Sequence, residues 1–229
     1  MEMKRFLHYL MVKGIVIALV STGAIAQDNT SSTSNETVPV IAPSPATPAP
    51  FTTFKNYPDN TFHLKVREYI NGMQKGAHNL LIWKNPAVNL SQYSSVKIKE
   101  FGGRLLPQQT AFSYDPFIAL FNSVFRSSVR LPQKDSPDSL LIEGAVVECN
   151  PGSRAARAWV GFGAGRSGGA VVCEIYEPGK PSPFIRIYTR ETTAAGGNWG
   201  GDSISMLNNI LSQVAMRLAT TVNTTVAVR

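Results

Sequence analysis

The sequence predicts an α+β domain: a roughly four-stranded, mainly antiparallel sheet with two amphipathic helices on one face, preceded by a signal peptide and a disordered linker. Two kinds of pattern carry this prediction. Short runs of β-branched residues bounded by turn residues are typical of strands. Longer stretches with apolar residues every three or four positions are typical of helices that bury one face.

Residues 1–26 have the three parts of a secretory signal peptide. Basic residues precede an apolar core at residues 14–20, and Ala24-Ile-Ala26 supplies the small residues of a cleavage site. The core is shorter than the roughly twenty apolar residues that a spanning helix needs. We therefore expect cleavage after Ala26 and a periplasmic or secreted protein. The long basic segment leaves an uncleaved anchor as the alternative.

Residues 27–55 are rich in Ser, Thr and Pro and have no apolar period, which predicts a disordered linker. An N-terminal extension at residues 56–92 and a core domain at residues 93–229 are expected to follow. No cysteine stands near the cleavage site, so we expect no lipid anchor at this N-terminus. Removing residues 1–26 deletes three basic residues and one acidic residue, which lowers the formal charge from +7 to +5 and favours anionic partners.

The N-terminal extension contains one predicted helix, over residues 62–70, where the apolar residues share one helical face. Residues 80–83 are expected to form a strand or a packed arm. Residues 94–101 alternate as a strand does, with Val96 and Ile98 facing inward.

The clearest helix covers residues 117–125, where three phenylalanines stand on one stripe. Asp115 is expected as its N-cap and Pro116 as its first residue. Residues 220–229 form a β-branched tail without an assignment. Three further strands are expected at residues 140–147, 170–176 and 184–189, and a second amphipathic helix at residues 204–218, capped by Asp202 or Ser203.

The most distinctive stretch is the glycine and arginine-rich segment, residues 152–169, between two predicted strands. It contains six glycines, and no acidic residue stands between Glu148 and Glu174. Such a segment could present positive charge and backbone N–H groups to an anion. Its candidate binding residues are Arg154, Arg157, Trp159, Phe162, Gly163, Gly165 and Arg166.

Two interpretations of this segment stay open. In the structural one, its glycines form bulges in a long twisted hairpin, while Trp159 and Phe162 pack on the domain's own helix. In the functional one, the segment contacts a partner. The spacing of Gly163, Gly165 and Gly168 matches a dinucleotide fingerprint, but a strand and not a helix follows, so no cofactor is predicted.

The motifs PGSRAAR, GFGAGR and VVCEIY, with a later GG before the C-terminal helix, resemble a bacterial family of exported, often lipid-anchored proteins catalogued as a domain of unknown function. The resemblance covers about residues 93–218. More remotely, the layout is similar to the periplasmic domains of the curli-secretion channel lipoprotein and of the Tol translocation protein's N-terminal module. The resemblance implies an envelope location, and the curli-channel likeness implies an oligomer; neither implies an activity.

Cys149 and Cys173 are the only cysteines, and such a pair in an exported chain favours a disulfide. A bridge would close the loop over residues 149–173 and add roughly 3 kcal/mol of stability. The alternative is two buried thiols on opposite faces, because the strand register decides whether the Cβ atoms meet. No third ligand accompanies the pair, so no metal site is expected.

No catalytic constellation is recognisable. His63 and His78 have no carboxylate placed to orient them, so an enzyme is not predicted. Carboxylates on paired strands could nevertheless meet as in a glycosidase, which leaves an envelope hydrolase as an alternative. These carboxylates are Glu143, Glu148, Glu174 and Glu177.

We therefore expect a non-catalytic cell-envelope binding or assembly module. Its partner would be an envelope protein or an anionic envelope surface, contacted through residues 152–169. Nucleic acid is not expected, because the exported chain lacks a nucleic-acid-binding motif. The alternatives are the envelope hydrolase and an oligomeric secretion or pore-type component.

Overall fold

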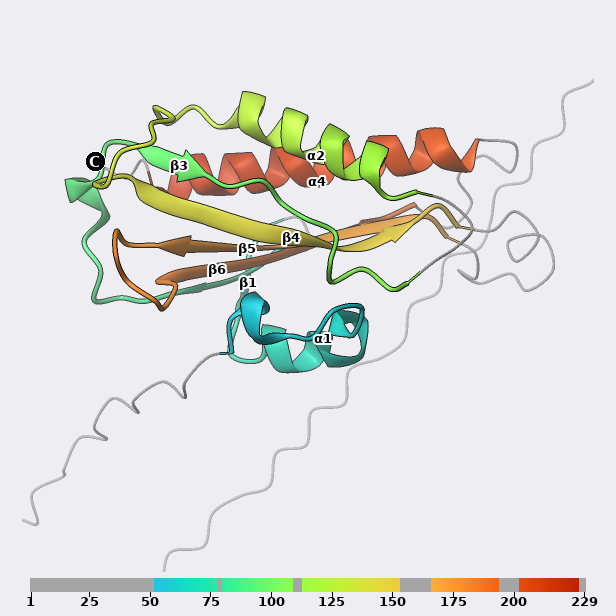
Figure 1. Ribbon diagram of the computed structural model, residues 1–229, viewed down its shortest axis with the longest axis horizontal. Coiled ribbons are helices and arrows are strands. Elements are labelled where there is room, and N and C mark those ends of the chain that lie inside the picture. Colours follow the sequence, from blue (N-terminus) through green and yellow to red (C-terminus); the bar gives the residue numbers. More distant parts are fainter. Residues whose placement is uncertain (1–51, 78–79, 109–112, 153–165, 194–201, 227–229) are drawn as a thin grey trace, which may run out of the picture. The chain divides into compact units, whose positions relative to one another are not determined.

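The computed structural model describes residues 52–77, 80–108, 113–152, 166–193 and 202–226 (Figure 1). The signal peptide, and the predicted linker up to residue 51, lie outside the described residues. The last four linker residues, 52–55, lie inside them, and Phe54 begins a short 3₁₀ helix, η1 (Phe54–Asn56), whose first side chain is buried. The expected domain boundaries stay a prediction.

Within the described residues, six strands form one mixed sheet in the order β1-β2-β6-β5-β4-β3. All neighbouring strands are antiparallel except β3 and β4, which are parallel. The strands are β1 (Gln74–Lys75), β2 (Leu80–Lys84), β3 (Val96–Ile98), β4 (Leu140–Asn150), β5 (Gly168–Tyr176) and β6 (Ile185–Thr192).

The prediction of four strands is wrong in number, whereas the mainly antiparallel pairing is confirmed, with β3–β4 as the one parallel pair among these strands. The two residues of β1 are too few to show an alternation, and the sequence left β2 open between a strand and an arm. β3 runs parallel to β4 because helix α2 (Asp115–Ser128) lies between them in the chain and returns it to the same end of the sheet.

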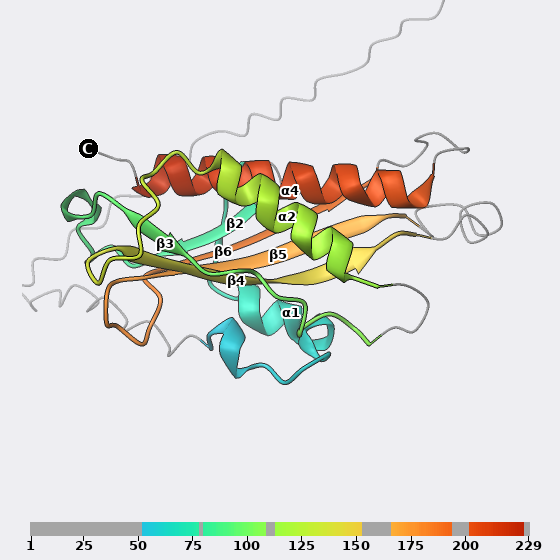
Figure 2. The same ribbon diagram turned by 45° about the horizontal axis from the view of Figure 1, so that its top comes forward.

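Three α-helices in the described part of the chain cover the two faces of the sheet. α2 and α4 (Ser203–Val226) pack together on one face, as the sequence predicts. α1 (Phe62–Ile70) has the predicted bounds but covers the opposite face, which the prediction left bare (Figures 1 and 2).

The core consequently has two layers. One lies between the sheet and the α2–α4 pair and includes Phe121, Phe125 and Val171. The other lies between the sheet and the α1 side and includes Phe54, Tyr69 and Val172. Every residue of β5 is buried, since a central strand covered on both faces has no side that faces solvent.

The C-terminal tail continues α4 up to Val226. Val222 and Val226 are buried against the α2–α4 layer, which stabilises the helix beyond the predicted end at Leu218. Threonine hydroxyls in this stretch donate back to carbonyls one turn earlier, as Thr220 does to Met216 at 2.9 Å. Packing therefore overrides the low helix propensity of a β-branched segment.

Two helix starts were predicted from capping residues, with different outcomes. Asp202 caps α4, because its carboxylate accepts the Ser205 N–H at 3.1 Å. Asp115 is not the N-cap of α2: Tyr114 holds that position and Asp115 is the first helical residue. The Ser113 hydroxyl accepts the Asp115 N–H at 3.2 Å and satisfies one of the free donors at this end.

Candidate binding cleft beside the glycine and arginine-rich segment

Most of the candidate binding residues lie outside the described residues. These are Arg154, Arg157, Trp159, Phe162, Gly163 and Gly165. Arg166 is described: it stands just before β5, is half-buried, and its Nε atom has no hydrogen-bond partner among the described residues. The interpretation of the segment as a contact surface therefore stays a prediction.

The two ends of the segment are held together at the neck of the β4–β5 hairpin. The Ser167 hydroxyl donates to the Pro151 carbonyl at 2.6 Å across the neck. At the β4 end of the neck, the Gly152 N–H donates to the Asn150 side chain at 2.9 Å, and Gly152 has a φ of 77°. This left-handed conformation favours glycine, so Gly152 is required by the turn that leads out of β4.

A cleft of about 440 Å³ opens beside this neck, on the α1 face of the sheet. Its apolar walls include Val66 of α1, Val147 of β4 and Ala170 of β5. The volume is in the range of small-molecule and side-chain pockets, which combine apolar walls with a few polar groups. The polar groups are supplied by His63, Tyr114, Glu148, Asn150, Tyr188 and Arg190.

An ion pair between β4 and β6 dominates the electrostatics of the cleft. Arg190 donates to both carboxylate oxygens of Glu148, at 2.5 and 2.9 Å, and this hydrogen bonding raises the pKa of Arg190. Glycine at position 168 makes room for the pair, since a Cβ atom there would lie 2.4 Å from Glu148 Oε1. Burial raises the pKa of Tyr188 to about 12, so its hydroxyl stays a neutral donor.

The glycines at the start of β5 serve close packing and do not form bulges. Gly168 and Gly169 occupy regular ladder positions opposite Asn150 and Cys149. A Cβ atom on Gly169 would lie 2.8 Å from Leu211 of α4, so glycine lets the helix approach the strand. The register shift in this hairpin falls on β4, between Val146 and Glu148.

The two cysteines are free and buried, and they do not form the expected disulfide in this structure. Cys173 is the register partner of Gly144, whereas Cys149 is the partner of Gly169. These positions differ by four residues along β5, roughly 13 Å at about 3.3 Å per residue. Disulfides need Cα atoms within about 7 Å, so the register prevents the bridge. Both side chains point into the same core layer, not to opposite faces.

Two of the strand carboxylates do meet. Glu143 and Glu174 are register partners on β4 and β5, on the α1 face. Glu143 pairs with Lys55, with Nζ and Oε1 2.7 Å apart, and Lys99 lies 3.5 Å from its other oxygen. Lys55 and Lys99 therefore neutralise the outer member of the carboxylate pair.

The inner member, Glu174, is fully buried in a dense set of donors. It accepts hydrogen bonds from the Phe54 N–H at 2.9 Å, the Tyr69 hydroxyl at 3.1 Å and the Tyr176 hydroxyl at 2.5 Å. Arg186 of β6 lies with its Nε atom 3.8 Å from the carboxylate and is itself buried. Burial raises the pKa of Glu174. Full burial and three hydrogen bonds from protein donors leave no place for a substrate at this carboxylate.

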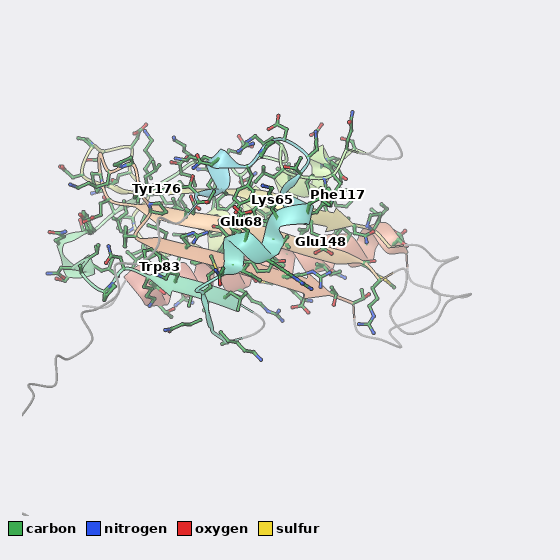
Figure 3. All side chains as sticks on the ribbon, turned by 90° about the horizontal axis from the view of Figure 1, so that it is seen from below. Lys65, Glu68, Trp83, Phe117, Glu148 and Tyr176 are labelled. Carbon is green, nitrogen blue, oxygen red and sulfur yellow. The ribbon has the colours of Figure 1, made fainter. Side chains whose placement is uncertain are left out.

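The other two strand carboxylates are also engaged. Glu148 holds Arg190, and Glu177 accepts the Tyr93 hydroxyl at 2.8 Å. Figure 3 looks onto the α1 face and shows Glu148 and Tyr176, the neighbour of Glu174, far apart along the sheet. The four carboxylates thus do not form one site. Among the described residues no group of His, Cys, Asp and Glu could hold a metal ion.

Phe54, one of the three donors to Glu174, belongs to a segment that we call the strap, residues 52–59. Arg104 donates to the carbonyls of three strap residues at 2.7–3.2 Å and to the Asp59 carboxylate at 2.8 Å. Arg186 donates to the carbonyl of Thr52 at 3.1 Å. Two arginines therefore hold the strap by its backbone on the sheet.

Neither Arg104 nor Arg186 was singled out from the sequence. Arg186 alternates with apolar neighbours on its strand, which is typical of a solvent-facing position. The signal that could have found it is the opposite charge of Glu174 on the neighbouring strand, but that pairing depends on the register. Arg104 stands in an irregular stretch with no pattern to mark it.

Comparison with known proteins gives a partial match to one family model and no function. Residues 122–197, about a third of the chain, match a family model described as a domain of unknown function (DUF4410), and this stretch includes the glycine and arginine-rich segment. No curated protein matches the chain. The expected likeness to a domain of unknown function is supported to this extent, while the export of its members and the remote likeness to the curli-secretion channel lipoprotein and the Tol module stay predictions.

Solved structures resemble the chain weakly. The PelC dodecamer from Paraburkholderia phytofirmans has 12% identity and a TM-score of 0.36, over 60% of this chain and 96% of that one. A minor lipoprotein from Acinetobacter baumannii has 7% identity and a TM-score of 0.34, over 58% and 95%. A DUF4136 family protein from Bacteroides thetaiotaomicron has 8% identity and a TM-score of 0.34, over 66% and 98%.

Within the described residues, no helix is both long enough and apolar enough to cross a bilayer.

Proposed function

We propose that the chain is an exported, non-catalytic binding or assembly module of the cell envelope. Its partner-contacting part is the glycine and arginine-rich segment, residues 152–169, together with the cleft at its neck. The observation that carries the proposal is this juxtaposition: the cleft of about 440 Å³ opens where β4 and β5 deliver both ends of the segment.

The supporting frame is rigid. β4 and β5 are the long inner strands of the sheet, and nearly all their residues are buried between two apolar layers. A contact segment mounted on such strands loses less conformational entropy on binding than one on a free loop, because its ends are already fixed.

The charge favours an anionic partner. The charge of Arg190 is already neutralised by its ion pair with Glu148. The net positive charge that a partner would meet therefore comes from the arginines of the segment. These are Arg154, Arg157 and Arg166, with no acidic residue between Glu148 and Glu174 to neutralise them locally. An envelope protein with an acidic surface, or an anionic envelope surface itself, has the complementary charge.

The bonding of the strand carboxylates argues for binding over hydrolysis. A glycosidase needs two accessible carboxyl groups at a defined separation. Glu174 is covered by the strap, and Glu143 is held by lysines. Glu143 and Glu174 both bind the strap, through Lys55 and the Phe54 N–H, and tying the strap to the sheet accounts for both side chains.

The experiment that tests the proposal compares the mature chain with a variant carrying Arg154→Ala, Arg157→Ala and Arg166→Ala. Each is immobilised and exposed to a detergent-solubilised envelope fraction, and bound proteins are identified by mass spectrometry; anionic vesicles are tested in parallel. We expect the variant to lose the partner while keeping the wild-type thermal unfolding. A double variant, Arg67→Ala with Lys75→Ala, changes exposed cations elsewhere and should keep it. Undiminished capture by the triple variant would refute the proposal.

Cell fractionation of the native protein, followed by intact mass and size-exclusion chromatography, tests location and assembly. A soluble periplasmic or secreted monomer beginning at Gln27 supports a binding module. A membrane-associated oligomer would favour an assembly or pore-type component, and a cytoplasmic protein that retains residues 1–26 would contradict export.

A further inference from the structure

A second concave site lies at the other end of the sheet from the hairpin neck. It is a groove of about 1130 Å³ built by three segments: the short helix η2 (Leu90–Gln92) with the residues after it, the turn after α2, and the last turn of α4. Figures 1 and 2 both show these segments gathered at the end where α4 finishes. The groove is therefore distinct from the cleft beside residues 152–169.

The walls of the groove are fixed by hydrogen bonds. Asn223 of α4 donates to the Ser128 carbonyl at 3.0 Å and accepts the Arg130 N–H at 2.9 Å. This side chain ties the end of α4 to the end of α2. A groove with braced walls is preformed and pays little for reorganisation when a ligand enters.

The floor of the groove is apolar and its rim is cationic. Leu90, Tyr93 and Leu131 are partly buried and pack against the main core. Arg130 and Lys134 stand exposed on the rim, and none of the described residues that line the groove is acidic. Asp135, the residue after Lys134, pairs with Lys97 instead.

We infer that the groove binds an extended acidic peptide segment of a partner protein, with apolar residues between the acidic ones. The apolar side chains would lie on Leu90, Tyr93 and Leu131, and the carboxylates would face Arg130 and Lys134. Charge complementarity selects the acidic partner. The concave shape favours a single chain, because a flat bilayer surface does not fill a groove whose apolar floor lies below a polar rim. This inference does not depend on residues 152–169.

The test uses the mature chain and a fluorescein-labelled hexapeptide of alternating leucine and glutamate, measured by fluorescence polarisation. Arg130→Ala with Lys134→Ala should weaken binding about fivefold to tenfold, as expected for the loss of two exposed ion pairs. The control variant Arg67→Ala with Lys75→Ala, which has the same change in charge away from the groove, should bind within about twofold of wild type.

Two matched probes separate the contributions of charge and apolar contact. Replacing glutamate by glutamine should remove most of the salt-sensitive binding, and replacing leucine by serine should remove the rest. Equal binding of the glutamine probe, or of the double variant, would overturn the inference, and so would no binding of any probe. Binding of phosphatidylglycerol vesicles without binding of the peptide would show a membrane contact and would also overturn it.

Discussion

Individual residues on β4 and β5 show how tightly the sheet is packed on both faces. Gly144 is the sharpest case: a Cβ atom there would lie 2.1 Å from Phe101 Cε1 and 2.2 Å from the Val172 carbonyl oxygen. The second neighbour is backbone and cannot move aside. The sequence offered no reason to single out Gly144, because a glycine within a strand pattern is compatible with either a bulge or a close approach.

Gly144→Ala should therefore destabilise the protein by about 3 kcal/mol or more, at the upper end for overpacked cores. Gly102 is a matched control, since nothing lies within 4 Å of a Cβ atom there. Gly102→Ala should change the free energy of unfolding by less than about 0.5 kcal/mol. Urea denaturation followed by circular dichroism measures both, and equal stability of the two variants would contradict the packing argument.

The thiols provide a second prediction at this scale. Burial raises the pKa of Cys149 from 9.0 to about 12, and burial also raises the pKa of Cys173. The folded state thus keeps both protons when the unfolded chain loses them, so stability is retained below about pH 9 and falls as the pH rises toward 12. Ellman's reagent at pH 8 should label both cysteines only after unfolding. Rapid labelling of the folded protein, or an intact mass lower by two hydrogens, would contradict this.

At the scale of elements, helices with a strong apolar stripe were predictable and the sheet order was not. The stripe of α1 predicts its bounds, since local spacing decides them. Strand order and the second covered face depend on contacts between residues more than a hundred positions apart, such as Phe54 with Glu174. The candidate cleft has the same origin: its walls come from α1, β4, β5 and β6, and no local pattern brings these together.

The strap is an element that no periodicity marks, and its attachment can be tested. Arg104→Met removes four hydrogen bonds to the strap and leaves three carbonyls without this donor. We expect a loss of about 2 kcal/mol of stability. Hydrogen exchange should accelerate in the strap, residues 52–59, more than in β4 or β5, because the strap opens locally.

Arg126→Met provides the control for the strap. Arg126 is partly buried and donates to one carbonyl, that of Ile98, at 2.9 Å on the other side of the sheet. Arg126→Met should leave the rate of hydrogen exchange at the strap unchanged. If Arg104→Met accelerated exchange evenly over the whole domain, the strap would be part of a single cooperative unit and not a clasp held by Arg104.

At the scale of the whole molecule, two binding regions are proposed at opposite ends of one sheet. The hairpin neck lies at Asn150 and Gly168, whereas the groove lies where η2, the turn after α2 and the end of α4 meet. A rigid sheet between them lets each site act without reshaping the other, since β4 and β5 are buried along almost their full length. Such an arrangement suits a module that joins two partners.

This arrangement predicts independence of the two sites. The triple variant Arg154→Ala, Arg157→Ala and Arg166→Ala should bind the leucine–glutamate peptide within about twofold of wild type, because distant sites are additive within about 0.5 kcal/mol. The double variant Arg130→Ala with Lys134→Ala should likewise keep the envelope partner. One variant could abolish both peptide binding and capture of the envelope partner while both variants unfold like wild type. The arginines would then serve a single extended surface, and the two-site arrangement would be wrong.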